Sequence, residues 1–238
     1  MPKIFKVILW LAGLFALIIL IQYPMQRSLD SWQTWSLPLA GQTIVLDPGH
    51  GGYDGGAEAS DDTQEKDIAL DVSNMLRDYL QQAGAMVYLT REGDYDLAAD
   101  ETKGLSKRKS EDIRNRVEFI KEKQADLFLS IHLNALPSKQ WRGAQSFYHP
   151  GLEQNQLLAE AVQSEIKRNL ANTNREALAM SQVYILKYAE TPGALVEIGF
   201  LSHEEEKELL KSSEYQQQMA ASIYEGVLQY VTEEVGSE

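Results

Sequence analysis

The amino-terminal part of the chain is apolar and carries no charge over a long stretch. Lys3 and Lys6 precede an uncharged segment from Val7 to Gln26 that is rich in Leu, Ile, Phe and Ala as far as Ile21. A helix needs about 20 apolar residues to span a membrane, and flanking lysines stay on the cytoplasmic side. The pattern predicts an uncleaved transmembrane helix with the rest of the chain outside the cytoplasm. A cleaved signal peptide is the alternative, although no small-x-small triplet closes the apolar run.

From residue 43 onward, short apolar runs alternate with segments of helical periodicity. The runs predicted to be buried strands are residues 43–47, 85–90, 126–132, 143–149, 183–186 and 194–198. The apolar stripes that predict helices are Ile68, Val72, Leu76 and Leu80; Ile113, Val117 and Ile120; Leu158, Val162 and Ile166; and Met219, Ile223, Val227 and Val231. This alternation predicts an α/β fold, with a mostly parallel sheet covered by helices on both faces.

These patterns divide the chain into three parts. Residues 1–26 are predicted to be the membrane anchor, residues 27–41 a tether, and residues 42–234 a single folded domain. The tether contains Trp32, Trp35 and Pro38 and is interpreted as a linker. A length of 238 residues suits one domain with an appendage, because domains usually have about 100–200 residues.

Composition narrows the chemistry that the folded domain can perform. The chain has no cysteine, so it has neither disulfides nor a thiol nucleophile, and a metal must be bound by His, Asp or Glu. The formal net charge is −13. Nucleic-acid binding is therefore not expected, because it requires a basic surface.

Four polar side chains stand out because each interrupts an apolar pattern. His50 follows the first predicted strand in a glycine-rich turn, and His132 ends the third. Glu65 shares a helical face with the buried stripe, and Glu197 is the only charge between residues 191 and 201. Functional groups collect at the carboxyl ends of parallel strands, so we expect these side chains to converge.

Each of the four also has a plain structural interpretation. Taken alone, His50 would be interpreted as an exposed loop residue. His132 would be interpreted as a core histidine that forms a hydrogen bond with the backbone. The helix dipole favours an acid at Glu65, but it does not explain the inward direction of that side chain. A buried carboxylate at Glu197 is costly unless it is paired, metal-bound or used in acid–base chemistry.

Together the four residues predict a metal-dependent hydrolase. Two His and one Glu are the ligand set of a catalytic zinc, and we predict that His50, Glu65 and His132 hold the metal. Glu197 would take a proton from water and return it to the leaving nitrogen. His149 and His203 are predicted to be surface residues. The H-E-x-x-H and G-x-S-x-G motifs of other hydrolases are absent from the sequence.

The same segments resemble a known family. The chain is similar to the zinc-dependent N-acetylmuramoyl-L-alanine amidases in the segments Asp-Pro-Gly-His-Gly-Gly around His50, Ser-Ile-His-Leu-Asn-Ala around His132 and Val-Glu-Ile-Gly-Phe-Leu-Ser around Glu197, and at Glu65. The resemblance implies that the amide between muramic acid and the L-alanine of the stem peptide is hydrolysed. It also implies Zn²⁺ at His50, Glu65 and His132, with Glu197 as the acid–base.

Within this family, the anchor, the tether and the absence of wall-binding repeats resemble the sporulation-specific amidases of endospore formers. That resemblance implies peptidoglycan of the spore cortex as substrate, in the space between forespore and mother cell. It also implies a downstream muramic acid deacetylase that makes muramic δ-lactam. A membrane-associated activating lipoprotein is a further expected partner. His203 departs from the Asn that many relatives have, which affects only fine substrate contacts.

Two other functions remain as alternatives. The chain could be a catalytically inactive, membrane-tethered protein that binds or regulates the cell wall, although all four polar residues are present. It could also be a zinc peptidase that cuts another peptidoglycan bond.

Overall fold

The computed structural model describes residues 10–15, 17 and 37–235. The chain divides into two units, Met1–Leu37 and Pro38–Glu238. In the first unit, residues 10–15 and 17 are helical. None of the described helices is long and apolar enough to cross a membrane. Most of the predicted anchor and tether lies outside the described residues.

The second unit is built on a six-stranded sheet with the order β2-β1-β3-β6-β4-β5. Its strands are β1 (Thr43–Pro48), β2 (Met86–Leu89), β3 (Leu127–Asn134), β4 (Gln145–Tyr148), β5 (Leu178–Ala179) and β6 (Gly193–Phe200). The strands β2, β1, β3 and β6 are parallel, whereas β4 pairs antiparallel with β6 and parallel with β5. The expected α/β fold with a mostly parallel sheet is confirmed.

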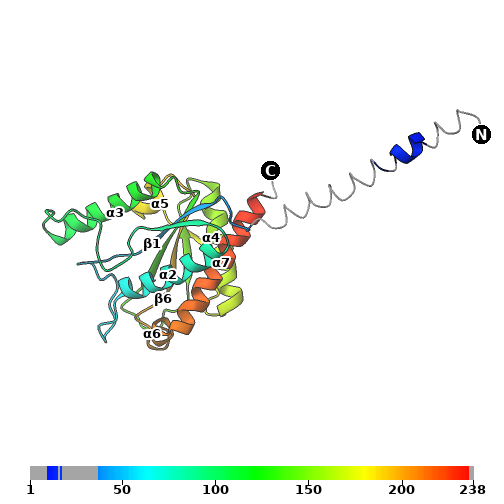
Figure 1. Ribbon diagram of the computed structural model, residues 1–238. Coiled ribbons are helices and arrows are strands. Elements are labelled where there is room, and N and C mark those ends of the chain that lie inside the picture. Colours follow the sequence, from blue (N-terminus) through cyan, green and yellow to red (C-terminus); the bar gives the residue numbers. More distant parts are fainter. Residues whose placement is uncertain (1–9, 16, 18–36, 236–238) are drawn as a thin grey trace, which may run out of the picture. The chain divides into compact units, whose positions relative to one another are not determined.

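Helices cover both faces of this sheet (Figure 1). They are α2 (Glu65–Gln82), α3 (Leu105–Glu122), α4 (Glu153–Leu170), α5 (Tyr184–Tyr188), α6 (Glu204–Lys211) and α7 (Ser213–Val235). On one face, Ile44 of β1 shares a buried cluster with residues of α2, α4 and α7. On the other face, Val45 of β1 shares a second cluster with residues of α3 and α5. Successive residues of a strand point to opposite faces, so the uninterrupted apolar run of β1 serves both clusters.

Two elements differ from the sequence-based expectation. Residues 183–186 were expected to form a strand, but Tyr184–Tyr188 is the short helix α5, with Ile185 and Leu186 buried. A run of four apolar residues is compatible with one buried turn of a helix as well as with a buried strand, so its periodicity does not distinguish the two structures. The two-residue strand β5 was not expected, because both of its residues are exposed and its run is too short to show alternation.

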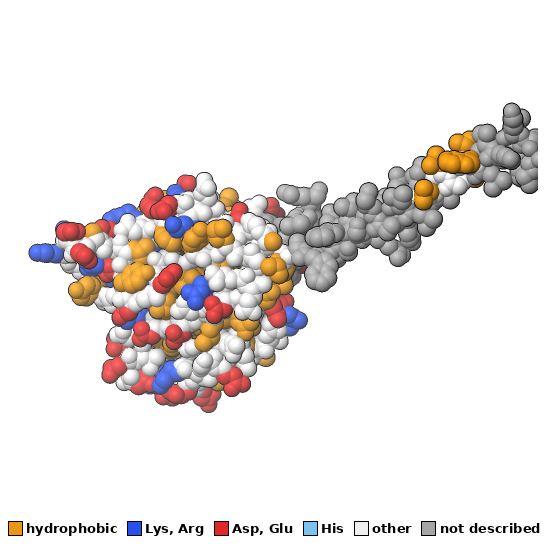
Figure 2. Space-filling model, viewed as in Figure 1, with side chains coloured by type: hydrophobic (Ala, Val, Ile, Leu, Met, Phe, Trp, Pro, Cys, Tyr) orange, Lys and Arg blue, Asp and Glu red, His pale blue; other side chains and the backbone are white. Residues whose placement is uncertain are grey.

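On the face of the domain that Figure 2 shows, acidic side chains are most numerous at one end. Figure 2 shows Asp and Glu side chains gathered over the end of the domain where Figure 1 places α6. Helix α6 begins with three glutamates, Glu204, Glu205 and Glu206. Glu206 is an exception, because it is buried and accepts hydrogen bonds from the backbone N–H groups of Gly143 and Phe200.

Candidate metal centre

The four candidate side chains come from one edge of the sheet. His50 lies two residues beyond the end of β1, His132 lies near the end of β3, and Glu197 lies in β6. Glu65 is the first residue of α2 and is almost completely buried, as its place on the apolar stripe predicted. His132 and Glu197 are partners in the parallel register of β3 and β6. The structure therefore brings all four together at the carboxyl ends of the parallel strands.

Three of these residues form a group that could hold a metal ion. One ligand atom from each of His50, Glu65 and His132 lies within 4.8 Å of the other two. His50 Nε2 is 3.3 Å from Glu65 Oε2, and His132 Nδ1 is 2.9 Å from Glu65 Oε1. In a tetrahedral site with bonds of about 2.0–2.2 Å, two donor atoms lie about 3.3–3.6 Å apart. The donor types and the spacing of His50 and Glu65 fit such a site.

Two glycines allow the ligand side chains to approach so closely. A Cβ atom at Gly49 would lie 2.4 Å from the His132 ring, and one at Gly56 would lie 2.5 Å from Glu65 Oε2. Gly56 also has a φ of +72°, and His50 itself has a φ of +61°. Left-handed backbone at a non-glycine residue is uncommon and concentrates at functional sites. The glycine-rich turn thus directs the His50 ring toward Glu65.

The three donor residues favour positive charge between them. Burial disfavours a charged ring at His50, but the carboxylates of Asp54 and Glu65 outweigh burial and raise the pKa of His50 to about 9. Burial likewise opposes the charge of Glu65, but His132 and His50 hold the pKa of Glu65 well below its usual range. The carboxylates near His50 therefore stabilise a proton on its ring, at the place where a metal cation would bind. This is expected of a buried set of metal ligands.

Glu197 has the opposite electrostatic character. Burial, reinforced by the negative charge of Glu65, raises the pKa of Glu197 to about 7 although His132 and His50 lower it. Its Oε2 atom is buried and has no hydrogen-bond partner in the described part of the chain. A carboxylate with a pKa near neutrality and a free oxygen can both accept and donate a proton at physiological pH.

Asp54, which the sequence offers only as an alternative to Glu65 as metal ligand, contacts His50 instead. Its Oδ2 atom lies 2.9 Å from His50 Nδ1, and its Oδ1 atom pairs with Lys109 Nζ at 2.7 Å. A carboxylate on one imidazole nitrogen fixes the ring and its tautomer, which leaves Nε2 free toward Glu65. The spacing of four residues between Asp54 and His50 in an irregular loop carries no periodic signal that would have revealed this contact.

A buried arginine holds the loop that carries His50. Arg116 of α3 donates to Asp47 Oδ1 at 2.7 Å and to Asp112 Oδ2 at 2.9 Å. It also donates to the backbone carbonyls of Pro48 and His50. One signal could have identified it, because Arg116 lies beside Val117 on the apolar stripe of α3.

A second buried arginine supports the same loop from the other side. Arg91, two residues beyond the end of β2, donates to the carbonyls of Pro48 and Gly49 at 3.0 and 2.9 Å. It also donates to the carbonyl of Lys66 in the first turn of α2, at 2.7 Å. Arg91 therefore links the His50 loop to the helix that begins with Glu65.

The other two histidines of the chain lie outside this group. His149 Nδ1 accepts a hydrogen bond from the Gly151 N–H, and His203 Nδ1 accepts one from the Glu206 N–H as the N-cap of α6. Both are half-buried rather than fully exposed, because they close local turns.

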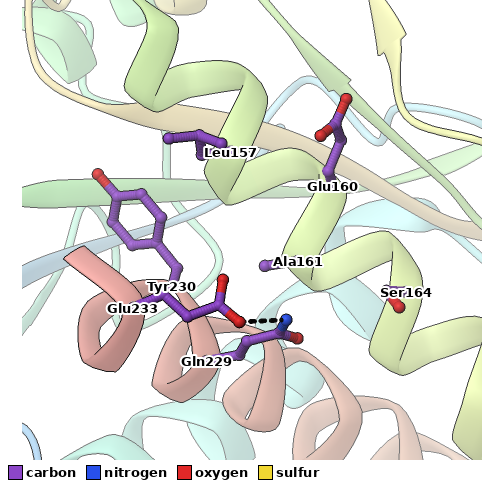
Figure 3. Close-up of a pocket in the computed structure, with 7 residues that line it drawn as sticks. All are labelled: Leu157, Glu160, Ala161, Ser164, Gln229, Tyr230 and Glu233. Carbon is purple, nitrogen blue, oxygen red and sulfur yellow. Dashed lines mark hydrogen bonds between the residues drawn. The ribbon is translucent and has the colours of Figure 1, made fainter. Parts of the chain in front are cut away.

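Two hollows in the domain surface differ in their relation to the site. One groove is lined by Glu197 together with Gln145, Trp141 and Arg175, among others. The other lies between α4 and α7 (Figure 3). Its carboxylates accept amide hydrogens from their own helices, Glu160 from Gln156 and Glu233 from Gln229. Of these two, only the first groove is lined by one of the four candidate site residues, Glu197.

Comparison with known proteins agrees with this geometry. The sequence model of a family described as N-acetylmuramoyl-L-alanine amidase matches residues 44–229. A germination-specific N-acetylmuramoyl-L-alanine amidase of Bacillus subtilis (strain 168) is 48% identical over 233 residues, which cover 98% of each chain.

Solved structures show the same fold. The CwlD amidase from Clostridioides difficile, in complex with the GerS lipoprotein, has a TM-score of 0.79 and 39% identity, covering 81% of this chain and 99% of that one. An N-acetylmuramoyl-L-alanine amidase from Clostridium difficile 630 has a TM-score of 0.71 and 28% identity, covering 80% and 97%. The chain therefore belongs to the N-acetylmuramoyl-L-alanine amidases, enzymes that hydrolyse the amide between N-acetylmuramic acid and L-alanine in peptidoglycan.

Proposed function

We propose that His50, Glu65 and His132 hold a zinc ion and that Glu197 is the acid–base of amide hydrolysis. The observation that carries the proposal is the unpartnered, buried Oε2 atom of Glu197 beside a His-Glu-His group. Two nitrogen donors and one carboxylate leave one position open in a tetrahedral zinc site, as in catalytic zinc centres. When bound, the zinc would polarise the substrate carbonyl and make a water molecule more acidic.

The residues of the chain then divide the remaining work. Glu197 accepts a proton from the attacking water, whose oxygen forms a bond to the lactyl carbonyl carbon. Glu197 returns that proton to the nitrogen of L-alanine as the C–N bond breaks. A pKa of about 7 suits both steps, because the group is neither a strong acid nor a strong base at neutral pH. Asp54 keeps the His50 ring in place throughout, through the contact at Nδ1.

Mass spectrometry of muropeptides tests the bond that is cut. Purified domain loaded with zinc is incubated with peptidoglycan, and the soluble products are compared with those of the Glu197→Gln variant. Free stem peptides that begin with L-alanine, together with peptide-free muramic acid, are expected from the unaltered domain only. Cleavage within the stem peptide would instead indicate a zinc peptidase. The absence of any product would favour a wall-binding or regulatory protein.

The biological setting that we propose is spore formation. The relative from Bacillus subtilis, 48% identical along nearly the whole chain, is named as germination-specific. Removal of stem peptides would leave bare muramic acid for a deacetylase, which makes the muramic δ-lactam of the cortex.

We also propose a membrane-associated lipoprotein as an activating partner. The support is that the CwlD amidase, with which this domain shares 39% identity, was solved in complex with the GerS lipoprotein. Activity of the domain alone is expected to be modest and to increase when such a partner is added.

The proposed location is a membrane anchor at residues 1–26 and a tether at 27–41, with the catalytic domain at 42–234 outside the cytoplasm. The support is the uncharged segment between Lys6 and Arg27, with lysines before it. Amino-terminal sequencing of protein from the membrane fraction decides the question. A mature start between residues 25 and 41 would identify a cleaved, secreted enzyme instead.

A further inference from the structure

Arg175 is a cation at the edge of the Glu197 groove that has no acidic partner. It lies between α4 and β5 and is half-buried. No carboxylate in the described part of the chain forms an ion pair or hydrogen bond with its guanidinium, although the chain has a net charge of −13. The neighbouring Arg142, by contrast, pairs with Glu205 at 3.7 Å. An unpaired arginine in the groove that the proposed acid–base also lines suggests that its partner is part of the substrate.

The guanidinium of Arg175 is held in position without its charge being neutralised. Its Nη1 donates to Gln145 Oε1 at 3.1 Å, and its Nη2 donates to the carbonyl of Arg142 at 3.4 Å. The guanidinium carbon lies 5.6 Å from the ring centroid of Trp141 and 5.3 Å from that of Phe200. A guanidinium has five N–H donors, so two hydrogen bonds leave others available for an anion. Its fixed planar shape suits a carboxylate in particular.

A row of paired residues connects Arg175 with the metal centre. His132 of β3 is the register partner of Glu197 in β6, and Glu197 is the register partner of Gln145 in β4. Residues directly opposite each other project from the same face of a sheet. Neighbouring strands lie about 4.8 Å apart, so Gln145 lies about 10 Å from His132 across the sheet. Arg175 contacts the far end of this row through Gln145.

A short peptide that starts at the cleaved amide covers most of this distance. An extended dipeptide spans about 7 Å, so the second residue after the cleaved amide reaches the neighbourhood of Gln145 and Arg175. The other described side chains that line the groove are amides, aromatic rings and aliphatic groups, apart from Glu197 itself. Arg175 is therefore the one positive charge that the described groove offers to this part of a substrate.

We propose that Arg175 determines substrate specificity by binding a free carboxylate on the residue that follows L-alanine in the stem peptide. The proposal rests on the proposed function, because it takes Glu197 and the His-Glu-His group as the point of cleavage. Gln145 acts as a positioning residue, because its hydrogen bond holds the Arg175 guanidinium at the end of the row that is farther from His132. Substrates in which this carboxylate is converted to an amide would lose the charge-assisted hydrogen bonds.

Two synthetic substrates that differ in one group test the proposal. They are N-acetylmuramoyl-L-alanyl-D-isoglutamate and its isoglutamine counterpart, hydrolysed by the zinc-loaded domain. The unaltered domain should prefer the free carboxylate by about tenfold or more in kcat/KM, chiefly through KM. Arg175→Gln should lose this preference, with a lower rate on the carboxylate substrate and less than about a twofold change on the amide. Arg175→Lys should keep part of the preference, because lysine keeps the positive charge but lacks the planar guanidinium that can donate two parallel hydrogen bonds to a carboxylate.

Arg142→Gln is the matched control. It removes the same charge from the adjacent loop, but from a side chain that pairs with Glu205 and does not line the groove. This variant should retain the full preference. Because the preference is a ratio measured within one protein, partial loss of folding does not change it.

The outcomes separate this proposal from the one on which it rests. An unaltered domain that cleaves both substrates equally, or an Arg175→Gln variant that loses activity equally on both, would overturn the specificity role and leave the amidase assignment intact. Failure of the unaltered, zinc-loaded domain to cleave either substrate at the lactyl–alanine amide would instead count against the proposed function.

Discussion

His132 and Glu197 are adjacent partners in the parallel register of β3 and β6. Neighbouring residues in one register share a face of the sheet, so the backbone itself sets the separation between a proposed metal ligand and the proposed acid–base. The register shifts immediately after this pair, between His132 and Asn134. Such irregularities are frequent next to active sites, where they redirect side chains. A slip of one residue would send Glu197 to the opposite face.

Replacement of Glu197 by Gln should abolish most of the activity while zinc stays bound. The amide has nearly the shape of the carboxylate but cannot accept a proton from water, and loss of an acid–base group costs about 10²–10⁴ in rate. The measurements are kcat on a soluble muropeptide and zinc content by elemental analysis. Glu160→Gln, in the hollow between α4 and α7, is the control and should leave both unchanged. Full activity in the Glu197→Gln protein would rule out its assigned role.

Removal of any one proposed ligand should lower zinc content and activity together. His50→Ala, Glu65→Ala and His132→Ala each take one donor from the group, and two donors hold zinc much less tightly than three. His149→Ala is the matched control, because its Nδ1 accepts only a local backbone hydrogen bond. If Glu65→Ala kept stoichiometric zinc, the third ligand would have to be another acid, with Asp54 and Glu58 the nearest candidates in the sequence.

Much of the site was predictable because its residues break simple patterns. Glu65 interrupts an apolar helical stripe and Glu197 an apolar strand, and parallel strands deliver such residues to one edge. Arg116 also interrupts a stripe, but its partner Asp47 is 69 positions away, and the spacing of the sequence does not encode that pairing. Arg175 lies in an irregular segment without periodicity, so only the three-dimensional structure places it beside the groove.

The rate of hydrolysis should fall as the pH decreases through the pKa of Glu197. Burial raises this pKa to about 7, and Glu197 must be ionised to accept a proton, so kcat/KM declines below the pKa. A divalent cation beside the carboxylate lowers the pKa, which sets the expected inflection between about pH 4.3 and pH 7. Bound zinc is measured across the same range, because protonation of His50 also releases metal. An inflection above pH 8 with zinc fully bound would contradict the assignment.

The pair of Asp47 and Arg116 should stabilise the domain in a pH-dependent way. Burial opposes the charge of Asp47, but Arg116, Ser130 and Thr90 hold its pKa below the usual range. A carboxyl group with a lower pKa in the folded than in the unfolded state adds stability above the unfolded value of about 3.9. That contribution is lost as the pH falls through the folded pKa. Asp47→Asn should therefore lower the free energy of unfolding at pH 7, with a difference that shrinks toward pH 3.

Replacement of Arg116 by Met tests the same pair from the other side. It leaves Asp47 buried without its cation, and breaking a buried pair costs about 3–5 kcal/mol in the free energy of unfolding. Urea denaturation at pH 7 measures the change. Arg168→Met, which removes an exposed arginine paired with Glu165 and Glu225, is the control and should have little effect. Equal stability of the two variants would show that the Asp47–Arg116 pair does not stabilise the domain.

In an endospore former that carries the gene, its deletion should give spores whose cortex lacks muramic δ-lactam, while the vegetative wall stays normal, if the sporulation role that we propose is correct. The lactam forms only on muramic acid that has lost its stem peptide, so an amidase has to act before the deacetylase. Muropeptide analysis of purified spores measures the lactam. Complementation with the unaltered gene should restore it, whereas complementation with Glu197→Gln should not, which distinguishes catalysis from a scaffolding role. A normal lactam content in the deletion strain would reject the sporulation role and leave a general wall amidase.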